Sequence, residues 1–452
     1  MTARPLNRRR RAAAGIVGLA LAATACGTGG STPEDEGSDA APKAGCEDYE
    51  KYEGSGNVSV YTSIRDAEAD AYVETFKDFE ECTGITIDYE GSGEFEAQLN
   101  VKVQGGNAPD IAFIPQPGLL QRFAAAGKLV EPSAETVANA EEYYSEAWRE
   151  YATVDGTFYG APNSSNVKSF VWYSPKQFAE AGYAVPETFD ELIELSDTIA
   201  ATGKKPWCAG IESGDATGWV ATDWTEDLML RDAGVDTYDK WVDHEIPLND
   251  PAVVSAVDKV GSILKNEEYV NGGYGDVRSI TTTPFGDGGL PILEGECFLH
   301  RQASFYSAFW PEGTKIAEDG DVFAFYFPAT DPSKGKPVLG GGEFVVAFAD
   351  RPEVQAVQTY LSSPEFVNAR AKAGPFTSAH TGLELESLGD NEIGKLSVEI
   401  LQDEASEFRF DGSDLMPAAV GSGSFWKGMT EWLNGKETEE ILKNIEDSYP
   451  KS

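Results

Sequence analysis

The stretch from Pro206 to Gly234 holds the densest set of side chains suited to ligand chemistry. It contains a cysteine, three tryptophans and several carboxylates, separated by small residues. Flat aromatic faces beside carboxylates suit a polyhydroxylated ring, whose C–H face lies on an indole while its hydroxyls donate to the acids. The same residues also fit a buried aromatic cluster followed by a helix N-terminus. The stretch alone leaves both interpretations open.

Groups for catalysis are not arranged in a recognisable pattern. Three histidines (His244, His300 and His380) are far apart and lack the spacing of metal ligands, so we predict no metal site. No Gly-x-Ser-x-Gly motif occurs, which weakens a serine hydrolase interpretation. We therefore expect no enzymatic activity and no cofactor. A carboxylate pair for glycoside hydrolysis remains an alternative, because the chain has 76 acidic residues.

Three polar segments outside this stretch are further binding candidates. Residues 163–166 (NSSN) and Lys168 form either a loop or a hydrogen-bonding ligand wall. The run Gly340–Gly342 precedes a β-rich segment and favours a bulge, a hinge or a close backbone approach to a ligand. Arg409 stands between two phenylalanines, where its guanidinium can span two sugar hydroxyls or form a structural ion pair.

Charge and the N-terminal sequence restrict the partners. The formal net charge of the 452-residue chain is −41, which argues against a nucleic-acid partner. Residues 1–25 combine a basic start, an apolar run and small residues, which is typical of a signal peptide. Cys26 then resembles the lipid-modified first residue of a bacterial lipoprotein, although Ala23 replaces the usual leucine. Residues 26–56 are rich in Gly, Ser, Pro and acids and predict a flexible tether.

The first half of the chain predicts an α/β region. Strands are expected at 57–63, 85–89 and 109–114, with helices at 68–82 and 94–104 between them. This alternation indicates a mostly parallel sheet, whose ligands bind beyond the carboxyl ends of the strands. Ser63–Asp66, Gly91–Phe95 and Pro115–Pro117 should therefore meet at one rim.

The second half alternates less regularly. We expect a short hairpin-like piece from Thr157, strands at 169–174, 321–328 and 343–348, and helices at 186–202, 224–232, 251–265, 352–361 and 364–372. Four cysteines follow Cys26: Cys46, Cys82, Cys208 and Cys297. An even number in an exported chain favours disulfides, and three pairings are possible.

Several segments resemble a known family along most of the chain. They include "TGITIDYEGSGEFEAQL", "GGNAPDIAFIPQPGLL", "APNSSNVKSFVWYSPKQF", "PWCAGIESGDATGWVATDWTEDLMLR", "GGGEFVVAF" and "FRFDGSDLMPAAVGSGSFWKGM". With these segments the chain resembles the solute-binding lipoproteins of carbohydrate ABC importers, in particular the actinobacterial α-glucoside-binding type.

The resemblance implies a two-lobed α/β fold of the periplasmic-binding-protein kind, with a ligand cleft between lobes that are joined by hinge crossovers. The N-terminal lobe would comprise 57–163 plus 337–379, and the C-terminal lobe 164–336 plus 380–452. The strand of Glu343 would then join the first sheet. Because each pair would lie on one side of the hinge, this division favours the disulfides Cys46–Cys82 and Cys208–Cys297.

The function implied is capture of an α-glucoside or gluco-oligosaccharide, maltose- or trehalose-like, by lobe closure and delivery to permease subunits. The protein would be a lipid-anchored monomer on the extracytoplasmic face of the cell membrane. A receptor for a non-sugar cation such as a polyamine and a secreted glycosidase are the alternatives. The predicted substrate-binding residues are Ser92, Gln116, Asn166, Lys168, Glu212, Trp219, Asp223, Trp224, Gly341, Gly342 and Arg409.

Overall fold

The computed structural model describes residues 45–49, 51–52, 54–331, 333, 335–403 and 405–450. The described residues belong to one compact unit. The predicted signal peptide, Cys26 and most of the predicted tether lie outside the described residues.

The end of the predicted tether is packed instead of free. Cys46 forms a disulfide with Cys82, as predicted. Tyr52 is buried against Phe79, with ring centroids 5.3 Å apart. The prediction of a tether up to residue 56 is therefore wrong for this part, because a covalent link and an aromatic contact fix it to α1 (Asp66–Thr83).

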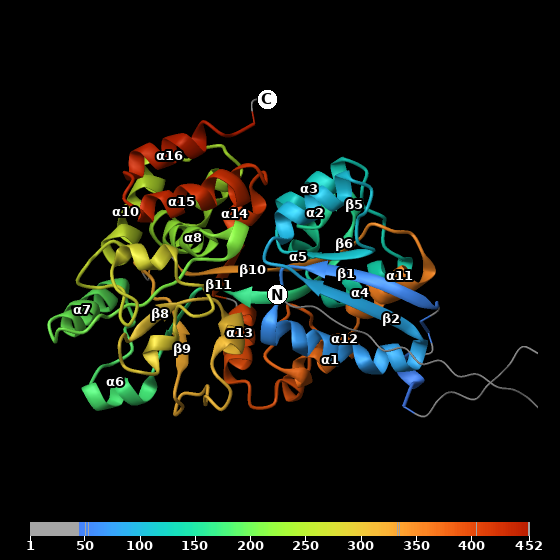
Figure 1. Cartoon of the computed structure of the whole chain (residues 1–452), viewed down its shortest axis with the longest axis horizontal. Coiled ribbons are helices and arrows are strands. Elements are labelled where there is room, and N and C mark those ends of the chain that lie inside the picture. Colours follow the sequence, from blue (N-terminus) through green and yellow to red (C-terminus); the bar gives the residue numbers. More distant parts are fainter. Residues whose placement is uncertain are drawn as a thin grey trace, which may run out of the picture. The chain divides into compact units, whose positions relative to one another are not determined.

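The first lobe contains a six-stranded sheet, seen on the right of Figure 1. Its strands are β1 (Gly56–Thr62), β2 (Ile85–Gly91), β3 (Ile111–Ile114), β6 (Gly160–Val167), β10 (Lys336–Ala347) and β11 (Ser406–Phe410). β1 pairs in parallel with β2 and β3, as the β-α-β-α-β pattern predicts. β10 pairs antiparallel with β3 and with β6, and β11 joins the other half of β10 in parallel.

Helices cover both faces of this sheet because β1, β3 and the end of β10 alternate their buried side chains between two cores. One core involves α1, α11 (Pro352–Leu361) and α12 (Pro364–Ala373). The other involves α2 (Phe95–Gln104), α3 (Pro117–Ala125), α4 (Ala134–Tyr143) and α5 (Glu146–Glu150), near the hairpin of β4 (Thr153–Val154) and β5 (Thr157–Phe158). Proline at the first turn starts α3, α11 and α12, where its missing N–H is not needed.

The second lobe has its own large core and a three-stranded antiparallel sheet in the order β8-β7-β9. Its elements are β7 (Phe170–Tyr173), β8 (Leu299–Arg301), β9 (Phe323–Tyr326), α6 (Pro175–Ala181), α7 (Phe189–Ala200), α8 (Trp219–Ala233), α9 (Val235–Val242), α10 (Pro251–Leu264), α14 (Gly412–Leu415), α15 (Trp426–Leu433) and α16 (Thr438–Glu446). The predicted disulfide Cys208–Cys297 lies in this lobe. α13 (Glu392–Gln402) contributes to the second-lobe core and to one first-lobe core.

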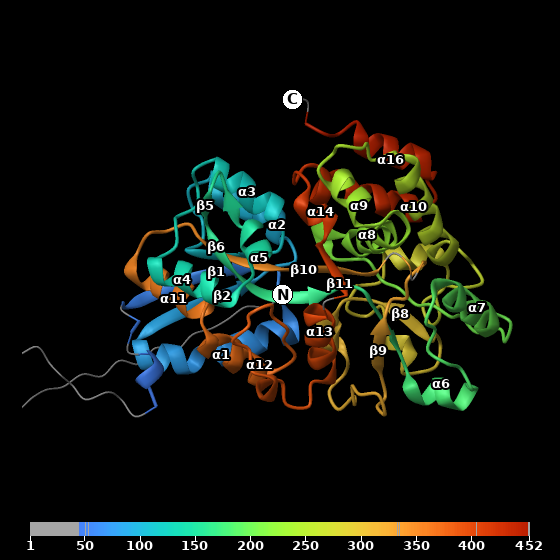
Figure 2. The ribbon, with the colours of Figure 1, turned by 180° about the vertical axis from the view of Figure 1, so that it is seen from behind.

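Two paired strands run between the lobes, as Figures 1 and 2 show for β10. Val338 and Leu339 at the start of β10 belong to the second-lobe core, whereas Val345 and Val346 near its end belong to the first. The loop interpretation of residues 163–166 is wrong, since they lie in β6. Gly341 pairs with Asn166 and Gly342 with Ser165, so both polar runs lie in the crossover itself. Residues 406–410, predicted in the C-terminal lobe, form β11 of the first sheet.

Candidate functional site

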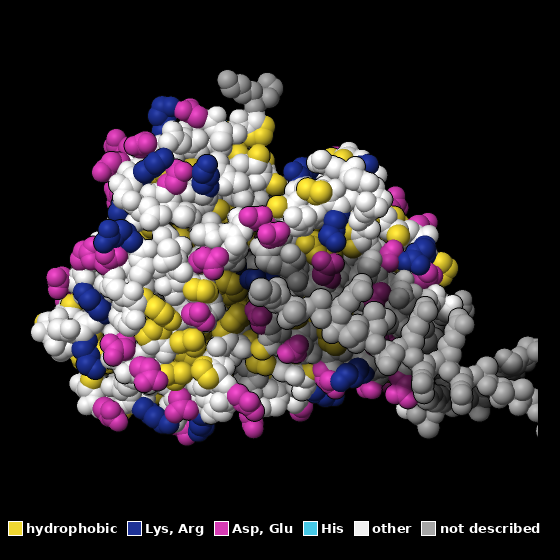
Figure 3. Space-filling model, in the orientation of Figure 1, with side chains coloured by type: hydrophobic (Ala, Val, Ile, Leu, Met, Phe, Trp, Pro, Cys, Tyr) yellow, Lys and Arg dark blue, Asp and Glu magenta, His cyan; other side chains and the backbone are white. Residues whose placement is uncertain are grey.

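A pocket with an empty volume of about 980 Å³, partly open to solvent, is lined by residues from both lobes and the crossover strands. Acidic side chains spread over both lobes on the face shown in Figure 3. The pocket itself is lined by acidic, aromatic and basic side chains. We divide this lining into a polar wall and an aromatic wall.

The polar wall is formed at the carboxyl ends of three parallel strands. Ser63–Asp66 follow β1, Ser92 and Gly93 follow β2, and Gln116 follows β3. The prediction that these three segments meet at one rim is confirmed. Gln116 Nε2 donates to Glu96 Oε1 at 2.9 Å, while Gln116 Oε1 is buried without a partner within the described residues. This free carbonyl can accept a hydrogen bond from a ligand hydroxyl.

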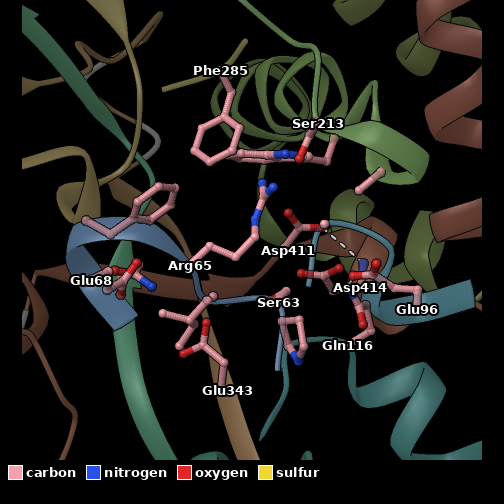
Figure 4. A pocket seen from close by; sticks show the side chains of 18 of the residues that line it. Ser63, Arg65, Glu68, Glu96, Gln116, Ser213, Phe285, Glu343, Asp411 and Asp414 are labelled. Atoms are coloured by element: carbon pink, nitrogen blue, oxygen red, sulfur yellow. Dashed lines mark hydrogen bonds between the residues drawn. The ribbon is translucent and has the colours of Figure 1, made fainter. Parts of the chain in front are cut away.

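Arg65 and Glu68 extend this wall at the start of α1. The guanidinium of Arg65 reaches into the pocket toward Phe285 and Ser213 (Figure 4). It lies so close to Gly93 that a Cβ there would be 2.7 Å from Arg65 Nη1. Asp66 has a φ of 57°, an uncommon conformation for a residue other than glycine, at the turn into the helix. The backbone geometry of this turn aims Arg65 across the pocket.

The aromatic wall belongs to the second lobe. Trp219 is half-buried at the first position of α8, with its ring 5.3 Å from Phe285 and 6.0 Å from Phe305. Phe309 continues the wall 5.2 Å from Phe285. Gly218 precedes Trp219 with a φ of 116°, and a Cβ at this position would approach Trp426 O to 2.1 Å. Glycine is therefore required to place the indole where it is.

A buried charge network lies beneath both walls. Lys168 Nζ donates to Asp223 Oδ1 at 3.1 Å and also to Asp411. Arg301 binds Asp227 at 2.9 Å and lies 3.6 Å from Asp223. All five side chains are buried, and a buried charge without a partner would cost several kcal/mol. This network connects the crossover to α8 and to α14.

The acids of this network titrate at different pH values. Burial raises the pKa of Asp223 to about 8, with Lys168 acting in the opposite direction. Burial would also raise the pKa of Asp411, but the Lys168 ammonium holds it below its usual range. Burial and the charge of Asp411 raise the pKa of Glu226 and of Asp414 well above their usual values. Among these four acids, Asp411 thus carries the negative charge, whereas Asp223, Glu226 and Asp414 favour the protonated form.

Three acids of this network could in principle hold a metal ion. Carboxylate oxygens of Asp223, Glu226 and Asp411 lie within 4.8 Å of one another. However, the Lys168 ammonium is bonded to Asp223 and to Asp411. A side-chain cation therefore already occupies the position where a metal ion would balance these charges.

Seven of the eleven predicted substrate-binding residues line the pocket: Ser92, Gln116, Asn166, Lys168, Trp219, Gly341 and Gly342. Two others are buried below it. Asp223 is fully enclosed in the Lys168 network, and Trp224 packs against Trp207, with ring centroids 5.3 Å apart. Trp219 and Trp224 are five residues apart in α8, about 1.4 turns, so that they point to different sides of the helix.

The remaining two predicted residues, Glu212 and Arg409, form polar contacts with other parts of the chain. Glu212 accepts a hydrogen bond from the backbone N–H of Gly214 at 2.8 Å. Arg409 donates to Asp239 through two nitrogens, at 2.6 and 2.9 Å, on a separate surface groove. Both side chains lie outside the pocket lining, and the structural ion pair considered for Arg409 is the arrangement observed.

Several lining residues were not predicted: Glu68, Glu96, Phe285, Phe305, Phe309, Glu343, Asp411 and Asp414. Glu68 and Glu96 stand in the first turns of helices that follow predicted strands, so their position beside the rim was a usable signal. The phenylalanines come from segments far from Trp219 in sequence, and no local pattern connects them.

In the described part of the chain, no helix combines the length and apolar character needed to cross a membrane. Residues 64–366 match the family described as bacterial extracellular solute-binding protein.

Two curated relatives match nearly the whole chain. The osmoprotective compounds-binding protein GgtB of Synechocystis is 43% identical over 82% of this chain and 87% of its own length. The alpha-glucosides-binding periplasmic protein AglE of Rhizobium meliloti is 36% identical over 87% of this chain and 86% of its own.

A solved structure matches the fold. The bacterial solute receptor AcbH, described as having an exclusive preference for β-D-galactopyranose, superposes with a TM-score of 0.75. The match covers 87% of this chain and 98% of AcbH at 20% sequence identity. It establishes the two-lobed solute-binding fold.

Proposed function

This chain belongs to the family of bacterial extracellular solute-binding proteins, and on that premise we propose that it is the sugar-binding component of an ABC importer that captures an α-glucoside. The observation that carries the proposal is the pairing of two unlike walls in one cleft. The half-buried Trp219 offers an apolar face, while Arg65 and Gln116 offer hydrogen-bonding groups opposite it. A pyranose needs both, because its ring faces are apolar and its edge carries hydroxyls.

The ligand class is narrowed by the relatives. AglE, 36% identical, is named for binding α-glucosides, and this is the class that we transfer to the present chain. GgtB, 43% identical, is named for binding osmoprotective compounds. A maltose- or trehalose-like disaccharide is the specific ligand we propose.

Capture would occur by closure of the lobes around the sugar. The proposed lobe division is 57–163 plus 337–379 and 164–336 plus 380–452, with β11 pairing across it. The walls belong to different lobes, and β6 and β10 connect the two. Bending of these strands would bring Trp219 toward Arg65 and expel water from the sugar. Gly341 and Gly342 lie at the crossover, where the absence of side chains lets a ligand approach the backbone.

The family places the protein outside the cytoplasm. We further propose that Cys26 carries a lipid anchor and that the monomeric receptor delivers its ligand to permease subunits in the same membrane. Two acyl chains on Cys26 would suffice for stable attachment. Metabolic labelling with a fatty-acid analogue should tag the full-length protein and fail to tag the Cys26→Ser variant. An unlabelled wild-type protein would exclude the anchor.

Calorimetric titration with maltose, trehalose, sucrose, galactose and spermidine tests the function. We expect heat from at least one α-glucoside, with a dissociation constant in the micromolar range or below, and none from spermidine. Binding of spermidine alone would favour the cation receptor, and release of reducing ends from an α-glucoside would favour the glycosidase. Either result would overturn the proposal that the protein binds sugars without chemical conversion.

A further inference from the structure

Two of the carboxyl groups that line the pocket, Glu68 and Glu343, lie apart from the Lys168 network. Glu68 stands in the first turn of α1 and is partly exposed to the pocket, whereas Glu343 lies in the crossover strand β10 and is only 9% exposed. Ser164 of the paired strand β6 donates a hydrogen bond to Glu343 Oε2. Figure 4 shows both acids on one side of the pocket, away from Glu96 and Asp414.

A buried arginine stands behind these acids. Arg370 of α12 is fully buried, and none of its three side-chain nitrogens has a hydrogen-bond partner within the described residues. Its guanidinium lies over the ring of Tyr72 at 4.5 Å and over that of Phe376 at 5.1 Å. A buried cation needs a compensating charge, and Glu68 and Glu343 are the acids that feel its field.

Arg370, Glu68 and Glu343 together are electrically neutral when one of the two acids holds a proton. Arg370 contributes one positive charge, and the two acids contribute two negative charges when both are ionised. Burial and the charge of Glu343 raise the pKa of Glu68 to about 7, and burial also raises the pKa of Glu343. Glu68 therefore holds a proton for much of the time at neutral pH, which leaves the group uncharged with Glu343 as the carboxylate.

Resting on the proposed function, we propose that Glu68 and Glu343 form a ligand subsite for adjacent hydroxyls of an uncharged sugar or polyol. Glu68 donates its carboxylic proton to one hydroxyl oxygen, and Glu343 accepts a hydrogen bond from a neighbouring hydroxyl. A ligand carboxylate would meet the charge of Glu343 and be repelled. A ligand ammonium would favour the state in which both acids are ionised, whereas the proposed subsite needs Glu68 in its protonated form.

The subsite makes affinity depend on pH in a defined direction. Ligand binding and lobe closure remove water from Glu68, which disfavours its charged form and raises its pKa further. By linkage, binding takes up a proton near neutral pH, so affinity is highest below pH 7 and falls as the pH rises above the pKa of free Glu68.

Most of the other charged or titratable groups around Glu68 and Glu343 keep their protonation state near neutral pH. Arg370 and the network-bound Lys168 remain positively charged. Burial raises the pKa of Tyr72 and of Tyr89 well above their usual value, so both phenols stay neutral. Asp223 also titrates near this range but belongs to the separate Lys168 network. A Glu68 variant separates the two contributions.

Calorimetric titration of trehalose and maltose at about pH 6 and about pH 8.5, in buffers of different ionisation enthalpy, tests the subsite. We expect the wild-type affinity to fall roughly three- to tenfold over this range, with net proton uptake on binding near neutral pH. Glu68→Gln should abolish the pH dependence and exceed the wild-type affinity at the higher pH, because the amide is always uncharged. Asp70→Asn, on the exposed side of α1, should behave as the wild type.

The outcomes separate this inference from the proposed function. Tight binding of a neutral sugar without pH dependence or proton uptake would overturn the subsite while leaving the sugar receptor intact. A Glu68→Gln variant with the wild-type pH profile would do the same. If the variant does not fold, the absence of proton uptake by the wild type would still overturn the subsite. No binding of any neutral sugar at either pH would instead overturn the proposed function.

Discussion

The two walls of the cleft are built in opposite ways. The polar wall comes from loops that follow three parallel strands, so its residues fall in three short segments of the first lobe. The aromatic wall brings together Trp219, Phe285 and the pair Phe305 and Phe309, from three segments that are separated by many residues. Hydrogen-bonding groups can thus be placed by a regular sheet edge, whereas a flat apolar surface has to be assembled by packing.

The difference also concerns what holds each wall in place. Arg65 and Ser92 depend on the backbone geometry of strand ends and helix starts. Trp219 depends on α8, which the buried Lys168–Asp223 contact fixes to the crossover. We expect substitutions in the network to affect stability first, and substitutions in the walls to affect affinity first.

The largest expected effect comes from breaking this network. Lys168→Met should lower the free energy of unfolding by about 3–5 kcal/mol, because Asp223 and Asp411 would remain buried without their cation. The loss should be larger at high pH, where these acids cannot take up protons as readily. Chemical unfolding at several pH values measures it.

A matched lysine provides the control for that experiment. Lys176 pairs with Asp321 at the surface, and both side chains are well exposed. Lys176→Met should therefore cost about 1 kcal/mol or less. Equal losses in the two variants would show that the buried network does not hold the aromatic wall to the crossover.

The second prediction concerns the aromatic wall. Trp219→Ala should weaken sugar binding by about 2 kcal/mol, or roughly 30-fold, because it removes the half-buried indole at the centre of the wall. Trp219→Phe keeps an aromatic face and should recover part of the affinity. Titration calorimetry, with thermal unfolding measured alongside, checks both; unchanged affinity in the alanine variant would remove Trp219 from the site.

The polar wall should respond less strongly. Arg65→Met removes charged hydrogen-bond donors and should weaken binding by about 1.5 kcal/mol, roughly tenfold. Arg122→Met, which changes an exposed arginine of the same lobe outside this pocket, is the control and should bind normally. A larger loss for Arg65 than for Trp219 would reverse the ranking of the two walls.

The smallest effect is expected at Arg409. Its ion pair with Asp239 is partly exposed, so Arg409→Ala should lower stability by about 0.2–1 kcal/mol and leave sugar affinity unchanged. The same titrations and unfolding curves test this. A clear loss of affinity would return Arg409 to the binding site, where the sequence motif had suggested it.

Local patterns predicted much of the first lobe. The helix of Ala71, Tyr72, Phe76 and Phe79 follows from apolar spacing, and the parallel order of β1, β2 and β3 follows from strands alternating with helices. The polar runs at 163–166 and 340–342 were harder to interpret. Composition allows a loop at 163–166 and a bulge or hinge at 340–342, but pairing with each other places both runs in the crossover strands.

The sequence by itself determined which segments form the rim of the first sheet, because the end of a parallel strand is a local property of the chain. It also placed a tryptophan in the cleft, but it did not distinguish Trp219 from Trp224. That choice depends on which side of α8 meets the second-lobe core. Only the tertiary structure decided it, together with the burial of Asp223 and the exposure of Glu68, since burial and pKa depend on contacts between segments far apart in the chain.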